Sequence, residues 1–267
     1  MAGRLAGKIA AVAGAGQTPG GNIGNGRAIA ILFAREGAAV LCVDRDGARA
    51  EETAAMIAAE GGTAFALQAD ISKHDGAASI VAAALARWDR LDILVNNVGI
   101  GGGGDGPAHI LEEAAFDRIL AVNLKGMWLT IKAALPVMRK QGSGAIVNIS
   151  SLAGIAGAQQ LAYEISKAAV NRMTASVAQA NAGKGVRCNA VAPGLMDTPL
   201  AVEGIAAATG VPIAEVRAAR DKRVPLGGKM GTAWDTANAT LFLASEESRF
   251  ITGIVLPVDG GASTRIA

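Results

Sequence analysis

Aromatic residues, cysteine and histidine are all scarce in this chain of 267 residues. Aromatics make up only 3% of it, so the core has to be built from Ala, Val, Ile and Leu. The two cysteines, Cys42 and Cys188, lie in apolar runs, which favours buried thiols over a disulfide. The two histidines, His74 and His109, lie far apart and away from cysteine. The sequence therefore predicts neither a disulfide framework nor a metal site.

An excess of charge of one sign is missing as well. With 25 Lys and Arg against 23 Asp and Glu, the net charge of +2 offers no electrostatic footprint for a nucleic acid or an anionic membrane. No stretch approaches the ~20 apolar residues of a membrane span, and the N-terminal residues lack the apolar segment of a secretory signal. We therefore expect a cytoplasmic protein that has small-molecule partners and binds no nucleic acid or membrane.

Short apolar runs rich in Val and Ile alternate with longer amphipathic segments. Runs with little polar alternation are typical of strands buried on both faces, as in a parallel sheet covered by helices. Spacings of three and four between Ala, Leu, Ile and Met predict the helices. The expected strands are Ile9–Ala13, Ala39–Val43, Ala64–Leu67, Ile93–Val95, Ala145–Ile149, Val186–Val191 and Ile254–Val258. The expected helices are Arg27–Arg35, Ala48–Ala59, Ala77–Trp88, Glu112–Arg139, Tyr163–Asn181 and Thr232–Ala244.

This alternation predicts an α/β fold, namely a Rossmann-type doubly wound parallel sheet of about seven strands with helices on both faces. No linker, charge block or repeat interrupts the pattern, so we expect a single domain over residues 1–267. The one irregular stretch, residues 199–226, is long for a connection. It is predicted to form a substrate flap, because ligands of such folds bind where the strands end.

Glycines follow the first expected strand. The strand ends in Ala-Gly-Ala-Gly (Ala13–Gly16), and a helix begins at Gly24–Ala30. Glycine here lets the backbone approach a pyrophosphate, whose charge then meets the helix N-terminus. Asp44, at the end of the second strand, can accept hydrogen bonds from both ribose hydroxyls and would repel a 2′-phosphate. The pattern therefore favours NAD over NADP, although the neighbouring Arg45 is of a type that accommodates that phosphate.

Tyr163 is the only tyrosine of the chain, and it falls four residues before Lys167. On a helix these two side chains lie on one face, a turn apart. Reduction of a carbonyl needs a proton for the forming alkoxide, and the reverse reaction needs a base. A phenol has a pKa of about 10, which a nearby ammonium group lowers. The pair is therefore suited to proton transfer at an alcohol oxygen.

These features resemble the short-chain dehydrogenase/reductase family over nearly the whole chain. The family's glycine motif, Thr-Gly-x3-Gly-x-Gly, corresponds to Ala13, Gly14, Gly24 and Gly26. The chain departs from the motif in two ways: alanine replaces the threonine, and six extra residues, about Thr18–Ile23, lengthen the loop. The resemblance implies that this extended loop still wraps the pyrophosphate.

Further motifs of the family follow later strands. By resemblance, Asp70 would contact the adenine, and Asn97 and Gly99 would lie along its ribose. The Met196 amide and the Thr198 hydroxyl would hold the nicotinamide carboxamide. The implied cofactor positions are Gly14, Gly24, Gly26, Asp44, Asp70, Ile71, Asn97, Gly99, Tyr163, Lys167, Pro193, Met196 and Thr198.

The resemblance also assigns four catalytic positions. Tyr163 would be the acid/base, Lys167 would lower its pKa and bind the nicotinamide ribose, and Asn123 would hold a water in the proton relay. A serine after the fifth strand would hydrogen-bond the substrate oxygen. The Ser-Ser-x-Ala-Gly motif selects Ser151, whereas the family's usual spacing to the tyrosine fits Ser150. We take Ser151, which implies a one-residue deletion in the following loop.

The expected function is that of an NAD-dependent oxidoreductase that interconverts a secondary alcohol and a ketone by hydride transfer. The alternatives are a nucleotide-binding sensor of the same fold without turnover and an NADPH-dependent 3-oxoacyl reductase. Enoyl reductase chemistry is disfavoured, because enoyl reductases related to this family space Tyr and Lys more widely. The resemblance implies a homotetramer.

Two segments near the expected site bear on the choice of substrate. The apolar residues of 199–226 favour a medium-sized alicyclic or hydroxyacyl-type substrate. The Gly101–Gly106 run is interpreted equally as a flexible loop or as a substrate-adjacent one. We interpret the basic cluster as a solvated helix face, unless the substrate carries a phosphate or a thioester carrier. The cluster consists of Arg217, Arg220, Lys222 and Arg223.

Overall fold

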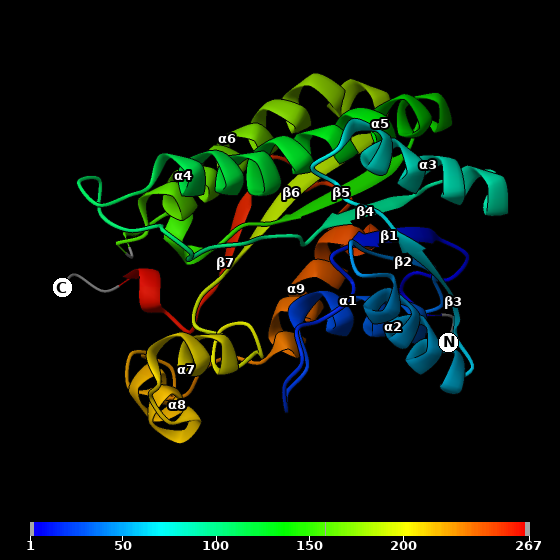
Figure 1. Ribbon diagram of the computed structural model, residues 1–267. Helices are drawn as coiled ribbons and strands as arrows, with labels where there is room; N and C mark the ends of the chain where they lie inside the picture. Colours follow the sequence, from blue (N-terminus) through cyan, green and yellow to red (C-terminus); the bar gives the residue numbers. More distant parts are fainter. Residues whose placement is uncertain (1–2, 158, 265–267) are drawn as a thin grey trace.

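A computed structural model describes residues 3–157 and 159–264. Within them lies a sheet of seven parallel strands in the order β3-β2-β1-β4-β5-β6-β7 (Figure 1). The chain adds strands outward from β1 to β3 and then returns to place β4 beside β1, which is the doubly wound order. The strands are β1 (Ile9–Ala13), β2 (Ala39–Asp44), β3 (Thr63–Gln68), β4 (Ile93–Asn96), β5 (Gly144–Ile149), β6 (Val186–Pro193) and β7 (Val255–Val258). The predicted Rossmann-type fold is confirmed.

Helices cover both faces of this sheet (Figure 1). Helices α1, α2 and α9 lie on one face, and α3, α4, α5 and α6 lie on the other. In the described ranges the helices are α1 (Asn25–Arg35), α2 (Gly47–Ala59), α3 (His74–Trp88), α4 (Glu113–Leu120), α5 (Met127–Gln141), α6 (Leu161–Asn181), α7 (Glu203–Thr209), α8 (Ile213–Asp221) and α9 (Ala233–Ala244). None of these described helices has the length and apolar character needed to span a bilayer.

The core consists of two apolar layers, one on each face of the sheet. Along β1, Ala10 and Val12 belong to the layer under α1 and α9, whereas Ala11 and Ala13 belong to the layer under α3 and α5. Because successive strand residues point to opposite faces, such a central strand has to be apolar throughout. The outermost strands β3 and β7 are partly exposed instead. The prediction that every strand is buried on both faces is therefore wrong for these two.

The segment predicted as a single helix over residues 112–139 is divided. Helix α4 ends at Leu120, Ala121–Gly126 forms a π-helical turn, and α5 begins at Met127. A π-helical turn within a helix frequently marks a functional site. Asn123 lies in this turn and is fully buried.

Residues 199–226 contain two short helices, α7 and α8, where the sequence predicted an irregular segment. Helices of seven and nine residues are marginal alone, so tertiary packing has to stabilise them. The packing comes from a separate apolar cluster of Val202, Val216, Val224 and Met230. We call residues 199–226 the flap.

Candidate active site

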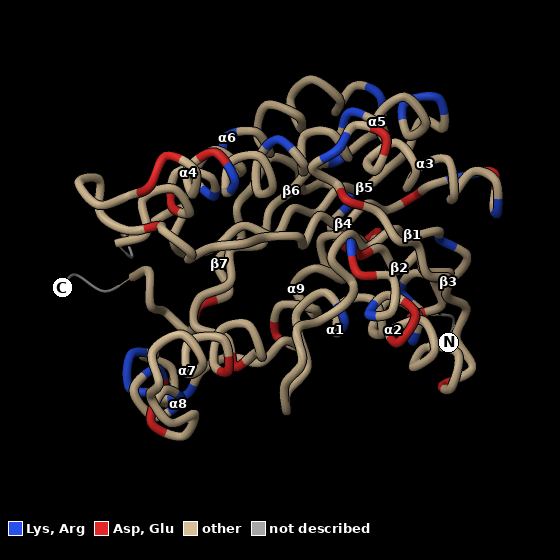
Figure 2. Tube along the Cα trace, in the orientation of Figure 1, with Lys and Arg blue, Asp and Glu red and all other residues tan. Residues whose placement is uncertain are grey.

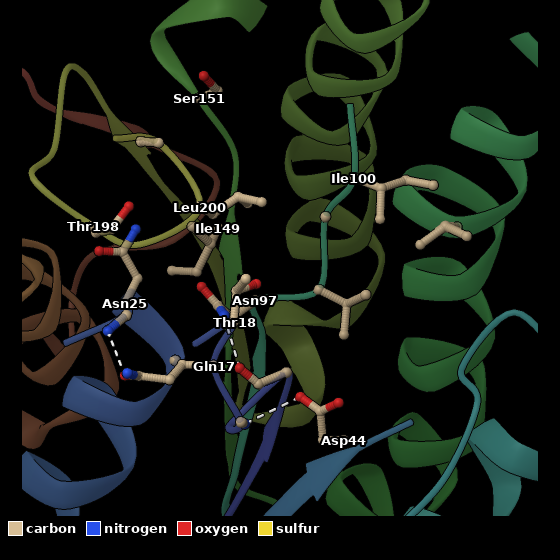
Figure 3. A pocket seen from close by; sticks show the side chains of 18 of the residues that line it. Gln17, Thr18, Asn25, Asp44, Asn97, Ile100, Ile149, Ser151, Thr198 and Leu200 are labelled. Atoms are coloured by element: carbon tan, nitrogen blue, oxygen red, sulfur yellow. Dashed lines mark hydrogen bonds between the residues drawn. The ribbon is translucent and has the colours of Figure 1, made fainter. Parts of the chain in front are cut away.

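A cavity of about 600 Å³ opens at the C-terminal ends of the central strands. Its walls come from the glycine loop after β1, the ends of β2, β4, β5 and β6, the first turns of α6 and the beginning of the flap. Figure 3 shows side chains from these segments around the cavity. All the predicted cofactor and catalytic residues line it, except Asn123.

Gly14 and Gly26 form a cradle that leaves no room for side chains. Gly14 has a φ of +82°, in the left-handed region that favours glycine. A Cβ atom at Gly26 would lie 1.8 Å from the carbonyl oxygen of Gly14. Asn97 Nδ2 donates a hydrogen bond of 2.9 Å to the same oxygen. Helix α1 begins beside this cradle, so its N-terminus is available to an anion.

The extended glycine loop folds around Gln17, a residue that the sequence analysis did not single out. Gln17 Oε1 accepts from the Gly24 amide over 2.9 Å, and Nε2 donates to the Asn22 carbonyl over 3.2 Å. Farther out, the Gly21 amide donates to Glu203 Oε1 over 3.1 Å. The extra residues therefore connect the glycine loop with the flap.

Asp44 stands at the end of β2, at the cavity wall (Figure 3). Its Oδ2 atom accepts from the Gly16 amide over 3.1 Å, and Oδ1 accepts from the Asp46 amide over 3.0 Å. Each carboxylate oxygen retains acceptor capacity, so Asp44 can still bind ribose hydroxyls. Arg45 and Arg49 line the cavity beside it, and Arg49 pairs with Asp46 over 2.9 Å.

Asp70 and Ile71 follow β3 at the same edge of the sheet. The Ser72 hydroxyl and amide donate to Asp70 Oδ1 over 2.7 and 2.9 Å. Hydrogen bonding to Ser72 lowers the pKa of Asp70, so this carboxylate is ionised at neutral pH. Ile71 is buried and adds an apolar surface to the wall.

The donor and acceptor set of the cavity fits a dinucleotide. Asn25 Oδ1 is buried, and no partner for it occurs in the described part of the chain. The Asn25 side chain points toward Thr198 (Figure 3), where the carboxamide end of the cofactor is expected. An unpaired buried acceptor costs about 1–3 kcal/mol, so a ligand that donates to it is favoured. The cradle suits the pyrophosphate and Asp44 suits the adenosine ribose.

Pro193, Met196 and Thr198 lie together where the chain leaves β6. Pro193 is the last residue of the strand, and the Thr198 amide donates to the Met196 carbonyl over 3.1 Å. Met196 and Thr198 are both buried against the cavity. The structure thus brings these three predicted residues to the wall that leads into the flap.

Lys167 is buried beneath the cavity floor, with 2% of its surface exposed. Its Nζ atom donates to the Ile149 carbonyl over 2.9 Å. A Cβ atom at Gly99 would lie 3.1 Å from Nζ, so the glycine gives the ammonium group its access to the cavity. Burial lowers the pKa of Lys167 to about 8, which still leaves most molecules protonated at neutral pH.

Tyr163 lies one turn before Lys167, and the Lys167 Nζ atom is 5.6 Å from the centre of its ring. Burial raises the pKa of the Tyr163 phenol, and hydrogen bonding to Ser151 opposes this effect only in part. Burial is the larger of these two effects, and the lowering of the phenol pKa by Lys167 stays a prediction. The phenol is protonated at neutral pH and can act as a proton donor.

The two adjacent serines after β5 point in different directions. Ser151 faces the Tyr163 phenol, and its Oγ atom accepts from the Ala153 amide over 3.1 Å. Ser150 Oγ donates to the Lys167 carbonyl over 3.2 Å and so binds the backbone of α6. The one-residue deletion inferred after Ser151 falls in a loop that includes Ala158, which lies outside the described residues.

The Asn123 side chain makes three hydrogen bonds within the described part of the protein. Its Oδ1 atom accepts from the Ile100 amide, and Nδ2 donates to the Ile100 carbonyl, each over 2.8 Å. Nδ2 also donates to Ser166 Oγ over 3.1 Å. Asn123 thus fixes the loop after β4 to the π-helical turn and to α6; both hydrogens of Nδ2 are used, and Oδ1 retains one lone pair.

Asp105 is a residue of the site that the sequence analysis did not identify. Its Oδ1 atom accepts from the Ala162 amide over 3.0 Å, and Oδ2 accepts from the Tyr163 amide over 3.1 Å. These amides belong to the first turn of α6, which begins at Leu161 rather than at the predicted Tyr163. The Gly101–Gly106 run is therefore a support for the tyrosine, since Asp105 caps its helix.

Comparisons with known proteins identify the family and the fold of the chain. Residues 21–263 match a family model described as Enoyl-(Acyl carrier protein) reductase. The chain is 38% identical over 262 residues to 2-(S)-hydroxypropyl-CoM dehydrogenase 3 of Xanthobacter autotrophicus, with 98% of both sequences covered. It superposes on a protein from Burkholderia xenovorans assigned as a short-chain dehydrogenase/reductase with a TM-score of 0.90, 44% identity and full coverage of both chains. It also superposes on a protein from Beutenbergia cavernae assigned as an NAD(P)-dependent gluconate 5-dehydrogenase, with NADP bound at low occupancy. Here the TM-score is 0.86, the identity 38% and the coverage 98% of each chain.

Proposed function

The chain belongs to the short-chain dehydrogenase/reductase family, and from this premise we propose that it is an NAD-dependent dehydrogenase that interconverts a secondary alcohol and a ketone. Its relatives are oxidoreductases that act on secondary alcohols. The proposal rests on one observation: a phenol, a hydroxyl and a buried ammonium group line the same cavity as the glycine cradle. They belong to Tyr163, Ser151 and Lys167.

The nicotinamide cofactor, when bound, would accept or supply the hydride. We assign its adenosine ribose to Asp44, whose charge disfavours a 2′-phosphate. The relative from Beutenbergia cavernae has NADP bound, so NADP is the second candidate. In that case Arg45 and Arg49, which line the same wall, would bind the phosphate.

In the proposed reaction Tyr163 exchanges a proton with the substrate oxygen. The protonated phenol suits ketone reduction, and Ser151 donates a hydrogen bond to the same oxygen. Lys167 provides a positive charge below the ring and a donor for the nicotinamide ribose. Asn123 positions the loop after β4 through Ile100 and, in this proposal, would also hold a water of the proton relay.

Three other functions are less well supported. Enoyl reduction would agree with the description of the matching family model, but the Tyr163–Lys167 spacing of one helical turn is narrower than is usual for enoyl reductases of this kind. A sensor without turnover would have no use for Tyr163, Ser151 and Lys167 together. An NADPH-dependent 3-oxoacyl reductase shares the chemistry and differs in cofactor and substrate.

We further propose that the protein is a homotetramer. Exposed apolar side chains lie on the layer of α5 and α6, where Trp128 is 44% and Ile165 is 40% exposed. The outermost strand β7 is only partly covered. Light scattering coupled to gel filtration measures the mass directly, and a monomer would contradict the proposal.

The proposed function is tested by turnover of the purified protein with NAD and with NADP. The panel should contain open-chain and alicyclic secondary alcohols and the corresponding ketones with the reduced cofactors. We expect turnover with NAD, and a loss of at least about a hundredfold in kcat for Tyr163→Phe, with NAD binding retained. Cofactor binding without turnover of any alcohol would favour the sensor, and full activity of Tyr163→Phe would exclude the assigned proton donor.

A further inference from the structure

Arg220 is an arginine of the flap that lines the cavity, and among the described residues no acidic side chain forms a salt bridge or hydrogen bond with it. It lies in the last turn of α8. In the described part of the chain its hydrogen-bond acceptor is the Met230 thioether sulfur, at 3.3 Å from Nε. A thioether is a weak acceptor, so most of the five N–H donors of the guanidinium group are unused.

We propose that Arg220 forms the anion-binding end of the substrate site, so that the alcohol oxidised by this chain carries a carboxylate or another anionic group. This inference rests on the proposed function and names the substrate class of the same cavity. It replaces the interpretation of the whole basic cluster as a solvated helix face. Lys and Arg gather on α8 (Figure 2), but only Arg220 of this group lines the cavity.

Asp197, the acidic residue whose charge favours the Arg220 cation, is already paired with another arginine. Arg217 binds both oxygens of Asp197, with Nε to Oδ2 at 2.9 Å and Nη2 to Oδ1 at 3.1 Å. Such a bidentate pair satisfies the carboxylate in charge and in geometry. Arg223, close to Arg220, adds repulsion rather than compensation. The positive charge of Arg220 therefore remains available to a ligand.

The apolar surroundings of Arg220 strengthen its interaction with a bound anion. Met196, Pro199, Leu200 and Ala201 line the neighbouring wall and contribute apolar surface. Burial lowers the pKa of Arg220, which reflects the cost of holding the cation away from water. A charge-assisted hydrogen bond in such a place is stronger than a neutral one, and a planar carboxylate matches the guanidinium group.

The position favours the substrate over the cofactor as the source of the anion. Figure 1 places α8 beside α7, away from β2, whose last residue is Asp44. The phosphates have their own cradle at Gly14 and Gly26, and a 2′-phosphate would have Arg45 and Arg49. Tyr163 and Ser151 line the same cavity as Arg220. A substrate whose alcohol oxygen meets this pair can therefore extend its other end toward the flap.

The test measures binding without turnover, so that it is independent of the reaction. The probes are cyclohexanecarboxylate and cyclohexanecarboxamide, which match in shape and differ in charge. Each is titrated calorimetrically into the protein loaded with NADH and into the protein alone. We expect the carboxylate to bind at least about tenfold more tightly than the amide, as one charge-assisted pair implies. Butanoate and butanamide repeat the comparison for a smaller molecule.

Arg220→Met should abolish this preference and leave the affinity for NADH unchanged. Arg220→Lys, which keeps the charge, should retain part of the preference for the carboxylate. This variant replaces Arg220→Met in the test if the methionine variant fails to fold. Arg223→Met is the matched control and should retain the preference. Equal affinities of acid and amide for the wild type with both pairs, or an unchanged preference in Arg220→Met, would overturn the proposal. A loss of NADH affinity in Arg220→Met would assign the arginine to the cofactor instead. Failure of NADH to bind would contradict the proposed function, and the titrations without cofactor still decide the role of Arg220.

Discussion

Replacing Lys167 by methionine should make the stability of the protein less dependent on pH. The pKa of Lys167 is lowered from 10.5 to about 8 by burial. Below pH 8 the native state holds a buried cation, which costs about 3 kcal/mol relative to the unfolded chain. Between pH 8 and 10.5 the unfolded chain binds more protons than the native one, so the stability of the wild type rises with pH. Above that window the penalty is gone.

Lys167→Met removes this penalty at every pH. It also leaves the Ile149 carbonyl without its donor, at a cost of about 1–3 kcal/mol, but this cost is the same at both ends of the window. The free energy of unfolding of the variant minus that of the wild type should therefore be larger at pH 7 than at pH 10, by about 2–3 kcal/mol. Urea unfolding of both proteins at the two pH values gives the difference directly. A stability difference that is the same at pH 7 and pH 10 would refute the reasoning.

Three other sets of substitutions test separate parts of the site. Asp44→Ala should weaken NAD binding and reduce the discrimination between NAD and NADP, which the ratio of kcat/KM for the two cofactors measures; unchanged discrimination would exclude the carboxylate as its cause. Asp105→Ala removes the cap of α6 and should cost about 1 kcal/mol of stability and lower kcat more than it raises KM, whereas Asp105→Asn should restore part of both. Ser151→Ala should lower kcat by at least about tenfold, and Ser150→Ala should act mainly on stability; the reverse order in steady-state assays would select Ser150 as the serine of the site.

The strands and the residues that follow them could be predicted from the sequence, because each depends on local patterns. A short apolar run such as Ile9–Ala13 predicts a buried strand of a parallel sheet without knowledge of the rest of the chain. Parallel strands also bring their C-terminal residues to one edge, so Asp44, Asn97 and Met196 could be expected near one another.

The features that could not be predicted depend on contacts between distant parts of the chain. The break in the helix over residues 112–139 coincides with the bonds of Asn123 to Ile100, 23 residues away. The short flap helices are stabilised by a cluster that periodicity within either helix does not reveal. Asp105 caps a helix 57 residues farther along, and nothing in its glycine-rich surroundings indicates that role. The pKa of Tyr163 depends on how deeply the ring is buried, which spacing alone does not determine.

The hydrogen bond between Gly21 and Glu203 joins the extended glycine loop to the flap, although these two segments lie 182 residues apart in the chain. In the proposed function the loop would hold the dinucleotide and the flap would face the alcohol. We therefore expect a displacement of one segment to be felt by the other, so that the order in which the two reactants bind would depend on a contact outside the cavity itself.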